Sequence, residues 1–239
     1  MAYQAIFKRY ELKYLLTTEQ KKLILTAMEP QMAPDQYGRT TIRSLYFDTD
    51  NYRLIRNSIS KPVYKEKLRL RSYAQASPDS AVFVELKKKY RSMVYKRRVA
   101  MPEKDAVAWL CRERPCPVQG QIPAEIDYVL DFYKTLHPAM LLSYRREAFY
   151  ATDGSGFRVT FDDTILCRQD DLSLDSAVYG TPILPEGRVL MELKCTGGIP
   201  LWMTHVLTEN RIYKSSFSKY GTAYKTLIHP KRPEVSHHD

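Results

Sequence analysis

Residues 61–73 have the sequence KPVYKEKLRLRSY, in which charged and apolar side chains alternate. Basic residues occupy every second position from Lys65 to Arg71, and Leu68 and Leu70 lie between them. Because successive side chains on a β-strand point to opposite faces, this spacing places the cations on one face and the leucines on the other. The stretch therefore predicts a strand with one cationic face and one apolar face.

The same period-two alternation recurs in five further stretches of the chain. They are FKRYELKYLL (7–16), VFVELKKK (82–89), VYKRRVAM (94–101), GFRVTFDD (156–163) and RVLMELKC (188–195). One such strand is typical of an amphipathic sheet whose polar face meets water. Six of them, with Lys and Arg dominant and Glu-x-Lys pairs repeated, favour one shared cationic surface. If the sheet closes into a barrel, that surface lines a single cavity.

The charge of the chain is concentrated in part of its length. The 239 residues include 37 Lys and Arg against 27 Asp and Glu, a formal net charge of +10. Residues 61–98 hold twelve Lys and Arg against three Asp and Glu, which is +9 of that total. With 44% apolar residues and 12% aromatics, the composition supports a folded core and excludes collagen, low complexity and wholesale disorder.

Helical signals separate the strands. The spacing Thr17-x-x-Gln20 is a capping box and predicts a helix over 17–28. Prolines at the starts of other stretches suit a first helical turn, and we expect loops at 74–80, 115–121 and 170–187. The order of elements predicts an α+β protein, a mostly antiparallel sheet with helices outside it, as a single domain over 1–230 with a flexible tail at 231–239. The further predicted helices are 102–112, 123–136, 200–210 and 217–228.

The sequence also limits location and cysteine chemistry. No apolar run approaches the roughly 20 residues that span a bilayer, and the start, MAYQAIFKRYELKY, is charged where a signal peptide is apolar. We therefore expect a soluble, cytoplasmic protein.

The four cysteines, Cys111, Cys116, Cys167 and Cys195, lack CxxC spacing. The sequence therefore predicts buried free thiols and neither a zinc site nor a disulfide framework.

The motifs of several enzyme classes are missing. The chain contains no GxSxG, Walker A, GxGxxG or HExxH sequence. What remains, a dense array of Lys and Arg with a few carboxylates, suits phosphoryl chemistry, in which the protein supplies positioning and charge neutralisation. Glu192, which alternates with Lys194, is a candidate ligand for Mg²⁺ or Mn²⁺, since hard cations prefer carboxylate oxygen. The alternative role for Glu192 is a cross-strand ion pair.

Eight motifs carry a resemblance to a known family. In chain order they are RYELKYLL (9–16), SLYFDT (44–49), KLRLR (67–71), VELK (84–87), SYRREAF (143–149), RVTFDD (158–163), MELK (191–194) and FSKY (217–220). Over about residues 5–228 the chain resembles the catalytic domain of the vacuolar transporter chaperone (VTC), the polyphosphate polymerase family. That family is similar to the triphosphate tunnel metalloenzymes (CYTH-like), so the resemblance implies a closed antiparallel barrel around a basic tunnel.

The resemblance also implies an activity and a set of site residues. It implies a metal-dependent phosphotransferase that uses Mn²⁺ or Mg²⁺ and moves the terminal phosphoryl group of ATP to a growing polyphosphate chain. Glu192 and Glu11 are the implied metal ligands. The implied catalytic lining is Lys13, Arg69, Arg71, Lys87, Arg146, Arg158 and Lys219. Further phosphate contacts are implied for Arg9, Lys96, Arg98, Lys194 and Ser218.

Two positions depart from related patterns. Triphosphatases and adenylate cyclases of the tunnel superfamily open with Glu-x-Glu-x-Lys, whereas this chain has Arg9 at the first position. Loss of that carboxylate disfavours a two-metal hydrolase and fits the polymerase branch. Ser216 stands where eukaryotic members often place another Lys, and Lys214 is a candidate substitute.

Three other functions compete with the polymerase. A tunnel triphosphatase would hydrolyse ATP or tripolyphosphate, and a non-catalytic module would only bind polyphosphate. A nucleic-acid module would also be basic and rich in tyrosine. However, Tyr10 and Tyr14 share parity with Leu12, which predicts a core role and disfavours base stacking. The expected partners are ATP, inorganic polyphosphate and a separate membrane protein that receives the polymer.

Overall fold

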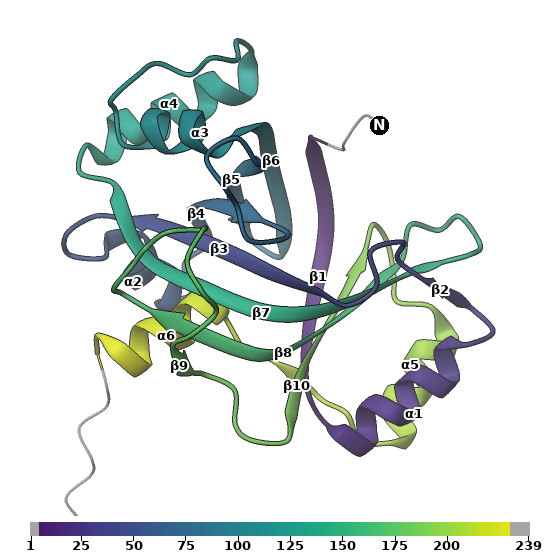
Figure 1. Cartoon of the computed structure of the whole chain (residues 1–239). Helices are drawn as coiled ribbons and strands as arrows, with labels where there is room; N and C mark the ends of the chain where they lie inside the picture. The colour runs from purple at the N-terminus through teal and green to yellow at the C-terminus, as the bar shows by residue number, and fades with distance from the viewer. Residues whose placement is uncertain (1–4, 230–239) are drawn as a thin grey trace, which may run out of the picture.

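The alternating segments form β-strands in the computed structural model, which describes residues 5–229 (Figure 1). Six helices accompany them within that range: α1 (Thr18–Met28), α2 (Arg53–Ile59), α3 (Glu103–Leu110), α4 (Gln121–Tyr133), α5 (Leu201–Glu209) and α6 (Lys219–Leu227). The strands in the same range are β1 (Ile6–Thr17), β2 (Met32–Pro34), β3 (Thr40–Asp48), β4 (Tyr64–Ser72), β5 (Ala81–Tyr90), β6 (Met93–Pro102), β7 (His137–Ala151), β8 (Arg158–Arg168), β9 (Thr181–Pro182), β10 (Arg188–Cys195) and β11 (Lys214–Ser215).

Eight of these strands close into an antiparallel barrel. The order around it is β7–β3–β4–β5–β6–β1–β10–β8, and β8 pairs back to β7 to complete the ring. The short strands β2, β9 and β11 pair with the outer parts of β7, β8 and β1. The predicted α+β class, a barrel with helices outside it, is therefore confirmed.

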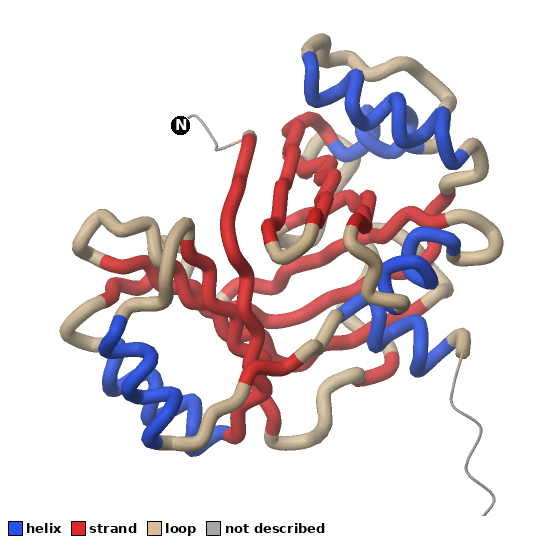
Figure 2. Tube along the Cα trace, turned by 180° about the vertical axis from the view of Figure 1, so that it is seen from behind, coloured by secondary structure: helices blue, strands red, loops and turns tan. Residues whose placement is uncertain are grey.

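Most strands turn their apolar faces away from the barrel axis, where helices cover them, but β3 also places Ile42 on the cavity wall. Leu68 and Leu86, on β4 and β5, are completely buried in a core that also contains Trp109 of α3 and Ile126 of α4. Seen from behind, the strands lie between separate groups of helices (Figure 2). Since the helices cover the outer faces, the charged faces of the same strands are left to line the interior.

Two further cores cover the rest of the barrel. Helices α1 and α5 lie side by side (Figure 1) and pack Ile24 and Met203 against β1, β8 and β10. Helices α2 and α6 pack Ile55 and Ala223 against β3 and β7. The FSKY motif (217–220) lies at the N-terminus of α6 and lines the cavity.

The predicted capping box at the start of α1 is present. The Gln20 amide nitrogen lies 3.1 Å from Thr17 Oγ1, and the Thr17 amide nitrogen lies 3.0 Å from Gln20 Oε1. Every predicted helix is found within a few residues of its expected ends. The tail predicted at 231–239 lies outside the described residues.

Some elements and environments differ from the predictions. Tyr14 is buried in the core, but Tyr10 is 38% exposed, so the predicted core role of Tyr10 is wrong. The cysteines are free as predicted; Cys167 and Cys195 are buried, whereas Cys111 and Cys116 are only partly so. Helix α2 and the long strands β3 and β7 were not predicted, because a short helix and strands buried on both faces lack a clear period.

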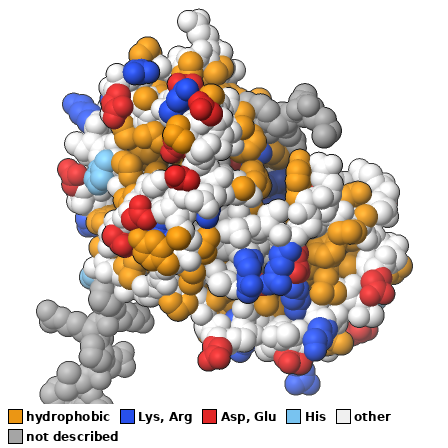
Figure 3. Space-filling model, in the orientation of Figure 1, with side chains coloured by type: hydrophobic (Ala, Val, Ile, Leu, Met, Phe, Trp, Pro, Cys, Tyr) orange, Lys and Arg blue, Asp and Glu red, His pale blue; other side chains and the backbone are white. Residues whose placement is uncertain are grey.

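The surface differs from the interior. The face seen in Figure 3 carries mixed acidic and basic side chains and apolar areas, with one group of Lys and Arg side chains near its lower centre. Among the described helices, none has the length and apolar character needed to cross a membrane.

Candidate functional site

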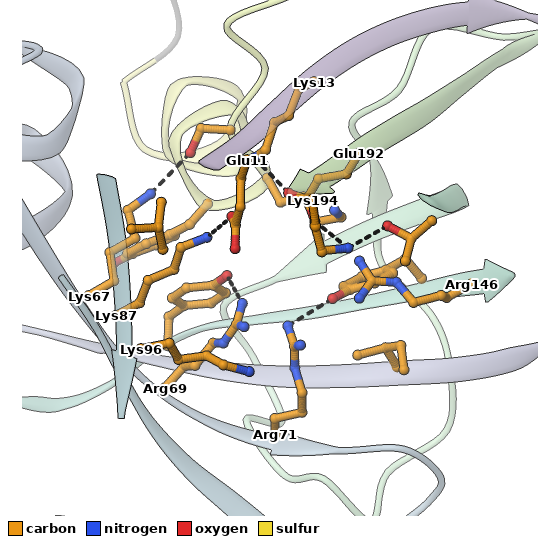
Figure 4. A pocket seen from close by; sticks show the side chains of 18 of the residues that line it. Glu11, Lys13, Lys67, Arg69, Arg71, Lys87, Lys96, Arg146, Glu192 and Lys194 are labelled. Atoms are coloured by element: carbon orange, nitrogen blue, oxygen red, sulfur yellow. Dashed lines mark hydrogen bonds and ion pairs between the residues drawn. The ribbon is translucent and has the colours of Figure 1, made fainter. Parts of the chain in front are cut away.

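The barrel encloses a cavity of about 1400 Å³. Its wall is built from the polar faces of the barrel strands and from the N-terminal end of α6 (Figure 4). All fourteen residues that the sequence singled out contribute to this wall, so the structure brings every one of them together. They are Arg9, Glu11, Lys13, Arg69, Arg71, Lys87, Lys96, Arg98, Arg146, Arg158, Glu192, Lys194, Ser218 and Lys219.

One group of cations is held by a single buried carboxylate, that of Glu85 on β5. Arg69 Nη2 lies 2.6 Å and Nε 2.8 Å from Glu85 Oε2. Arg98 Nε and Lys96 Nζ lie 2.8 and 3.2 Å from Oε1, and Arg71 approaches at 3.8 Å. Burial alone would raise the pKa of Glu85, but the surrounding cations, Arg69 first, outweigh burial and hold it well below its usual range. Glu85 is therefore ionised and fixes the arginines in place.

A second buried carboxylate, Asp162 on β8, holds the opposite side of the wall. Arg146 binds it through two nitrogens, with Nε at 2.6 Å from Oδ1 and Nη2 at 2.7 Å from Oδ2. Lys219 Nζ donates to Oδ2 at 2.5 Å, which ties the first residue of α6 to the barrel. Burial raises the pKa of Asp162, but Arg146 and Lys219 lower it more, so the net shift is downward. Such two-point contacts fix the guanidinium plane as well as its position.

Two more carboxylates face the cavity from adjacent strands. In the β1–β10 register Lys13 lies opposite Glu192 and Glu11 lies opposite Lys194, so the two acids are diagonal neighbours. Glu192 is 3.0 Å from Lys194 Nζ and 3.6 Å from Lys13 Nζ, and Glu11 accepts from Lys87. Although burial opposes it, the charge of Lys87 lowers the pKa of Glu11 to about 2.

This pair fits a hard divalent cation. Mg²⁺ is usually held by one or two carboxylates together with substrate phosphates and waters. Glu11 and Glu192 are both ionised and both face the cavity, which meets that requirement, whereas within residues 5–229 no larger group of His, Cys, Asp or Glu gathers. The cross-strand ion pair considered for Glu192 is present, with Lys13.

Tyrosine hydroxyls hold the far sides of two arginines. Arg69 Nη1 donates to the Tyr46 hydroxyl at 3.0 Å, and Arg71 Nη2 donates to the Tyr144 hydroxyl at 2.9 Å. Tyr46 in turn stacks on Tyr220 of α6 with ring centroids 4.6 Å apart. The arginines are thus fixed by contacts from both sides before any ligand binds.

At the FSKY motif, Ser218 performs a structural task as well. Its hydroxyl accepts from the Gly221 amide at 3.3 Å and so caps α6, and Lys67 Nζ donates to the same oxygen at 3.0 Å. Lys67 was not singled out as a site residue, yet it lines the cavity. Burial, followed by the neighbouring charges of Lys13 and Lys87, lowers the pKa of Lys67 well below its ordinary value.

Sequence reasoning missed the anchoring acids and three lysines. Glu85 and Asp162 share parity with wall residues, which was the available signal, but parity does not separate an anchor from a metal ligand. Lys61, Lys65 and Lys89 also line the cavity, as does Lys214, which the sequence had offered as a candidate.

Comparison with solved structures defines the class of fold. A putative adenylate cyclase from Bacillus halodurans matches with a TM-score of 0.55 and 14% identity, over 90% of this chain and 96% of its own. A putative adenylyl cyclase from Hippeastrum, described as having a dominant triphosphatase activity, matches with a TM-score of 0.52 and 15% identity, over 93% of this chain and 98% of its own. At these identities the likenesses show that the chain shares the fold of these two proteins. No curated protein sequence matches the chain.

The family follows from the sequence itself. The VTC domain model matches residues 8–228, nearly all of the described chain, and the protein belongs to the VTC domain family. The predicted resemblance is therefore confirmed. A closed tunnel with a wall of fixed arginines and lysines makes this a phosphate-handling domain.

Proposed function

We propose that the protein is a polyphosphate polymerase, which transfers the γ-phosphoryl group of ATP to a growing chain of inorganic polyphosphate inside the tunnel. The observation that carries the proposal is the convergence of all fourteen predicted site residues on one cavity inside the barrel. The proposal gives Lys13, Arg69, Arg71, Lys87, Arg146, Arg158 and Lys219 the catalytic role, with Arg9, Lys96, Arg98, Lys194 and Ser218 as further phosphate contacts.

The anchored arginines supply position and charge. Arg69 and Arg71 on one side and Arg146 on the other are held by Glu85, Asp162 and tyrosine hydroxyls, so they can grip a triphosphate without reorganising. Glu11 and Glu192 would hold Mn²⁺ or Mg²⁺. When bound, that ion would neutralise charge between phosphate groups.

The lack of a strong general base favours a phosphate acceptor over water. Most basic groups of the wall are guanidinium or ammonium groups. Burial lowers the pKa of Lys67 and Lys96, and these two amines are engaged with Ser218 and Glu85. A terminal phosphate oxygen of the acceptor is anionic and needs no deprotonation. It forms the new O–P bond at the γ-phosphorus as the bond to the β,γ-bridging oxygen breaks, and ADP leaves with that oxygen.

A tunnel triphosphatase is the second candidate. The adjacent carboxylates Glu11 and Glu192 favour it, because a second acid beside the first can help to hold a metal and orient water. Against it, Arg9 occupies the first position of the Glu-x-Glu-x-Lys pattern on β1. Its Nε lies 3.4 Å from Glu11 and adds positive charge where a third acid would add negative charge. A binder without activity is the remaining alternative.

The proposed ligands are ATP and inorganic polyphosphate, and the cytoplasm is the proposed compartment. A separate membrane protein that receives the polymer is a proposed partner. Nucleic acid is not proposed, since the cavity lies inside the barrel and its wall is rich in Lys and Arg.

The kinetics of ATP consumption test the proposal. The pure protein is incubated with ATP and Mn²⁺, with and without short polyphosphate, and ADP and free phosphate are followed together. A polymerase should show a lag that added short polyphosphate abolishes, with ADP formed in excess of free phosphate. Stoichiometric free phosphate from the start, with no effect of polyphosphate, would assign the triphosphatase instead.

A further inference from the structure

A buried carboxylate outside the cavity wall, that of Asp48, takes no part in the site described above. Asp48 is the last residue of β3, is completely buried and is not among the residues that line the cavity. It belongs to the SLYFDT motif (44–49), which carries part of the family resemblance. No residue of that motif was predicted to contact phosphate, so the motif needs another explanation.

Asp48 binds the start of one helix and the side chain of another. Its carboxylate accepts hydrogen bonds from the backbone amides of Thr49, Leu54 and Ile55 at 2.8–3.0 Å, and so caps the first turn of α2. The Tyr220 hydroxyl of α6 donates a fourth hydrogen bond to Asp48 Oδ2 at 2.9 Å. Burial first, and then the charge of Asp48, raise the pKa of Tyr220, so the hydroxyl keeps the proton that it donates.

Tyr220 carries this contact to the tunnel wall. Its ring is buried and stacks on the Tyr46 ring, with centroids 4.6 Å apart and planes 22° apart. Both tyrosines line the cavity, and Arg69 Nη1 donates to the Tyr46 hydroxyl at 3.0 Å. A continuous series of contacts therefore joins the buried carboxylate of Asp48 to the guanidinium group of Arg69.

The register between β3 and β4 makes this series part of a wider pattern. Tyr46 lies opposite Arg69, and Ser44 lies opposite Arg71. Arg71 Nε lies 3.3 Å from Ser44 Oγ, so each of these arginines contacts a hydroxyl on the residue that faces it. Since Ser44, Tyr46 and Asp48 occupy alternate positions, β3 supplies a polar row that supports the arginines of its neighbour.

We propose that Asp48 is a positioning residue for Arg69. By holding the Tyr220 hydroxyl, it fixes the ring that supports Tyr46 and thus the oxygen to which the guanidinium group donates. Glu85 holds the other edge of the same guanidinium group. An arginine held on both edges can bind phosphate without reorganising. The inference rests on the phosphate-binding role proposed for Arg69, which does not depend on polymerisation.

The variant Tyr220→Phe separates positioning from the capping of α2. It removes the hydroxyl that binds Asp48, keeps a ring that can stack on Tyr46, and leaves the backbone contacts of α2 in place. The matched control is Tyr224→Phe on the same helix. Tyr224 packs against Tyr52 and is not among the residues that line the cavity.

A double-mutant cycle shows whether the hydroxyl acts through Arg69. The affinity for metal-free tripolyphosphate is measured by calorimetry for Tyr220→Phe in the unchanged protein, in Arg69→Gln and in Arg146→Gln. Arg146 is held by Asp162 on the opposite side of the wall, so it reports any effect that does not pass through Arg69. Residues that act through one another give non-additive losses, whereas independent residues give additive ones.

We expect Tyr220→Phe to weaken binding about fivefold in the unchanged protein and in Arg146→Gln, but less than about twofold in Arg69→Gln. Tyr224→Phe should change the affinity less than about twofold. Asp48→Asn should reproduce the fivefold loss and should also lower the melting temperature, because its carboxylate caps α2 as well.

Equal losses in the two arginine backgrounds would mean that the hydroxyl acts on α6 as a whole, and would overturn the inference. Unchanged binding in Tyr220→Phe would overturn it too. Unchanged binding in Arg69→Gln alone would remove Arg69 from phosphate binding, and the inference would fall with it. If the dependence on Arg69 appears but no polymer is ever made, the positioning role holds and the polymerase proposal fails.

Discussion

The tunnel has two regions that handle positive charge in opposite ways. In the central region, six cations share two fully buried acids: Arg69, Arg71, Lys96 and Arg98 surround Glu85, and Arg146 and Lys219 bind Asp162. The second region, the lysine mouth, consists of Lys61, Lys65, Lys89 and Lys214, and within residues 5–229 none of these four forms an ion pair with Asp or Glu. Both regions belong to the same cavity wall.

The difference separates positioning from capture. Phosphoryl transfer requires donors held in place before the reaction, and a buried acid that binds several guanidinium groups provides this at the cost of part of their charge. Capture of a moving polyanion requires net charge and tolerates mobile side chains. The predictions below ask whether the two regions differ in these ways.

The largest effect is expected from Glu85→Gln. The substitution leaves four buried or half-buried cations without their shared anion, and breaking such a network typically costs about 3–5 kcal/mol of stability. We expect a marked fall in melting temperature, measured by calorimetry. We also expect loss of ATP turnover, measured as ADP release. Glu125→Gln is the control, because Glu125 pairs with Lys88 and Arg97 outside the cavity and should cost about 1 kcal/mol or less. Equal stability losses in the two variants would contradict the anchoring role.

Glu192→Gln tests the carboxylate that the central region offers to a metal. The amide keeps the shape and removes the charge, so activity with Mn²⁺ should fall by orders of magnitude. Metal-free ATP binding should persist or tighten, because a carboxylate beside phosphate repels it unless a cation lies between them. Glu147→Gln, which pairs with Lys21 and Arg39 on the outside, is the matched control. Unchanged metal dependence in Glu192→Gln would falsify the assignment.

A pH series probes the charge balance around Glu85. Burial lowers the pKa of Lys96 from an ordinary 10.5 to about 6, although Glu85 opposes the shift. Between these two pH values Lys96 is deprotonated in the folded protein and protonated in the unfolded chain. The free energy of unfolding therefore rises with pH across this interval. Phosphate binding, which favours the protonated amine, should weaken over the same range. The groups that face Lys96 are Glu85, Arg98, Arg71, Arg69 and the Phe7 ring.

Melting temperature and phosphate affinity are therefore measured from pH 6 to about pH 9, which covers most of the interval between the lowered and the ordinary pKa of Lys96. In Lys96→Met the rise of melting temperature with pH should be shallower than in the unchanged protein. Lys104→Met, an exposed control, should keep the original slope. Identical slopes in all three proteins would show that Lys96 stays charged and that Glu85 balances it fully.

The smallest effect is expected at the junction of the two regions. Ser218→Ala removes the cap of α6 and the partner of Lys67, which should cost about 1 kcal/mol of stability. Affinity for tripolyphosphate should fall only severalfold, because Asp162 still holds Lys219. Ser218→Thr, which keeps a capping hydroxyl, should recover most of the stability in thermal melts. A loss as large as that of Glu85→Gln would instead place Ser218 among the principal anchors.

Period-two alternation predicted most of the wall because most barrel strands place polar side chains in the cavity and apolar side chains under helices. Strands such as β4 and β10 have one face in the cavity and one under helices, and their residues alternate accordingly. Strand β3 is buried on both faces over most of its length, so TTIRSLYFD shows no clear period. The period thus found the strands that carry most of the site and missed two that complete the ring.

The division of labour within the wall could not be predicted from parity. Glu85 and Glu192 both alternate with lysine, yet Glu85 is completely buried among arginines while Glu192 lies beside Glu11. Which acid becomes an anchor depends on the register between neighbouring strands and on what the next strand places opposite. The lysine mouth likewise depends on β11, a two-residue strand that brings Lys214 to β1.

The destination of the γ-phosphoryl group tests the central claim most directly. ATP labelled in its γ-phosphate is incubated with the protein, Mn²⁺ and unlabelled tripolyphosphate, and the products are separated by chain length. The account predicts that the label appears in chains longer than the acceptor, in step with ADP, and that little becomes free phosphate. Label recovered entirely as free phosphate while ADP accumulates, with no labelled polymer at any time, would contradict it.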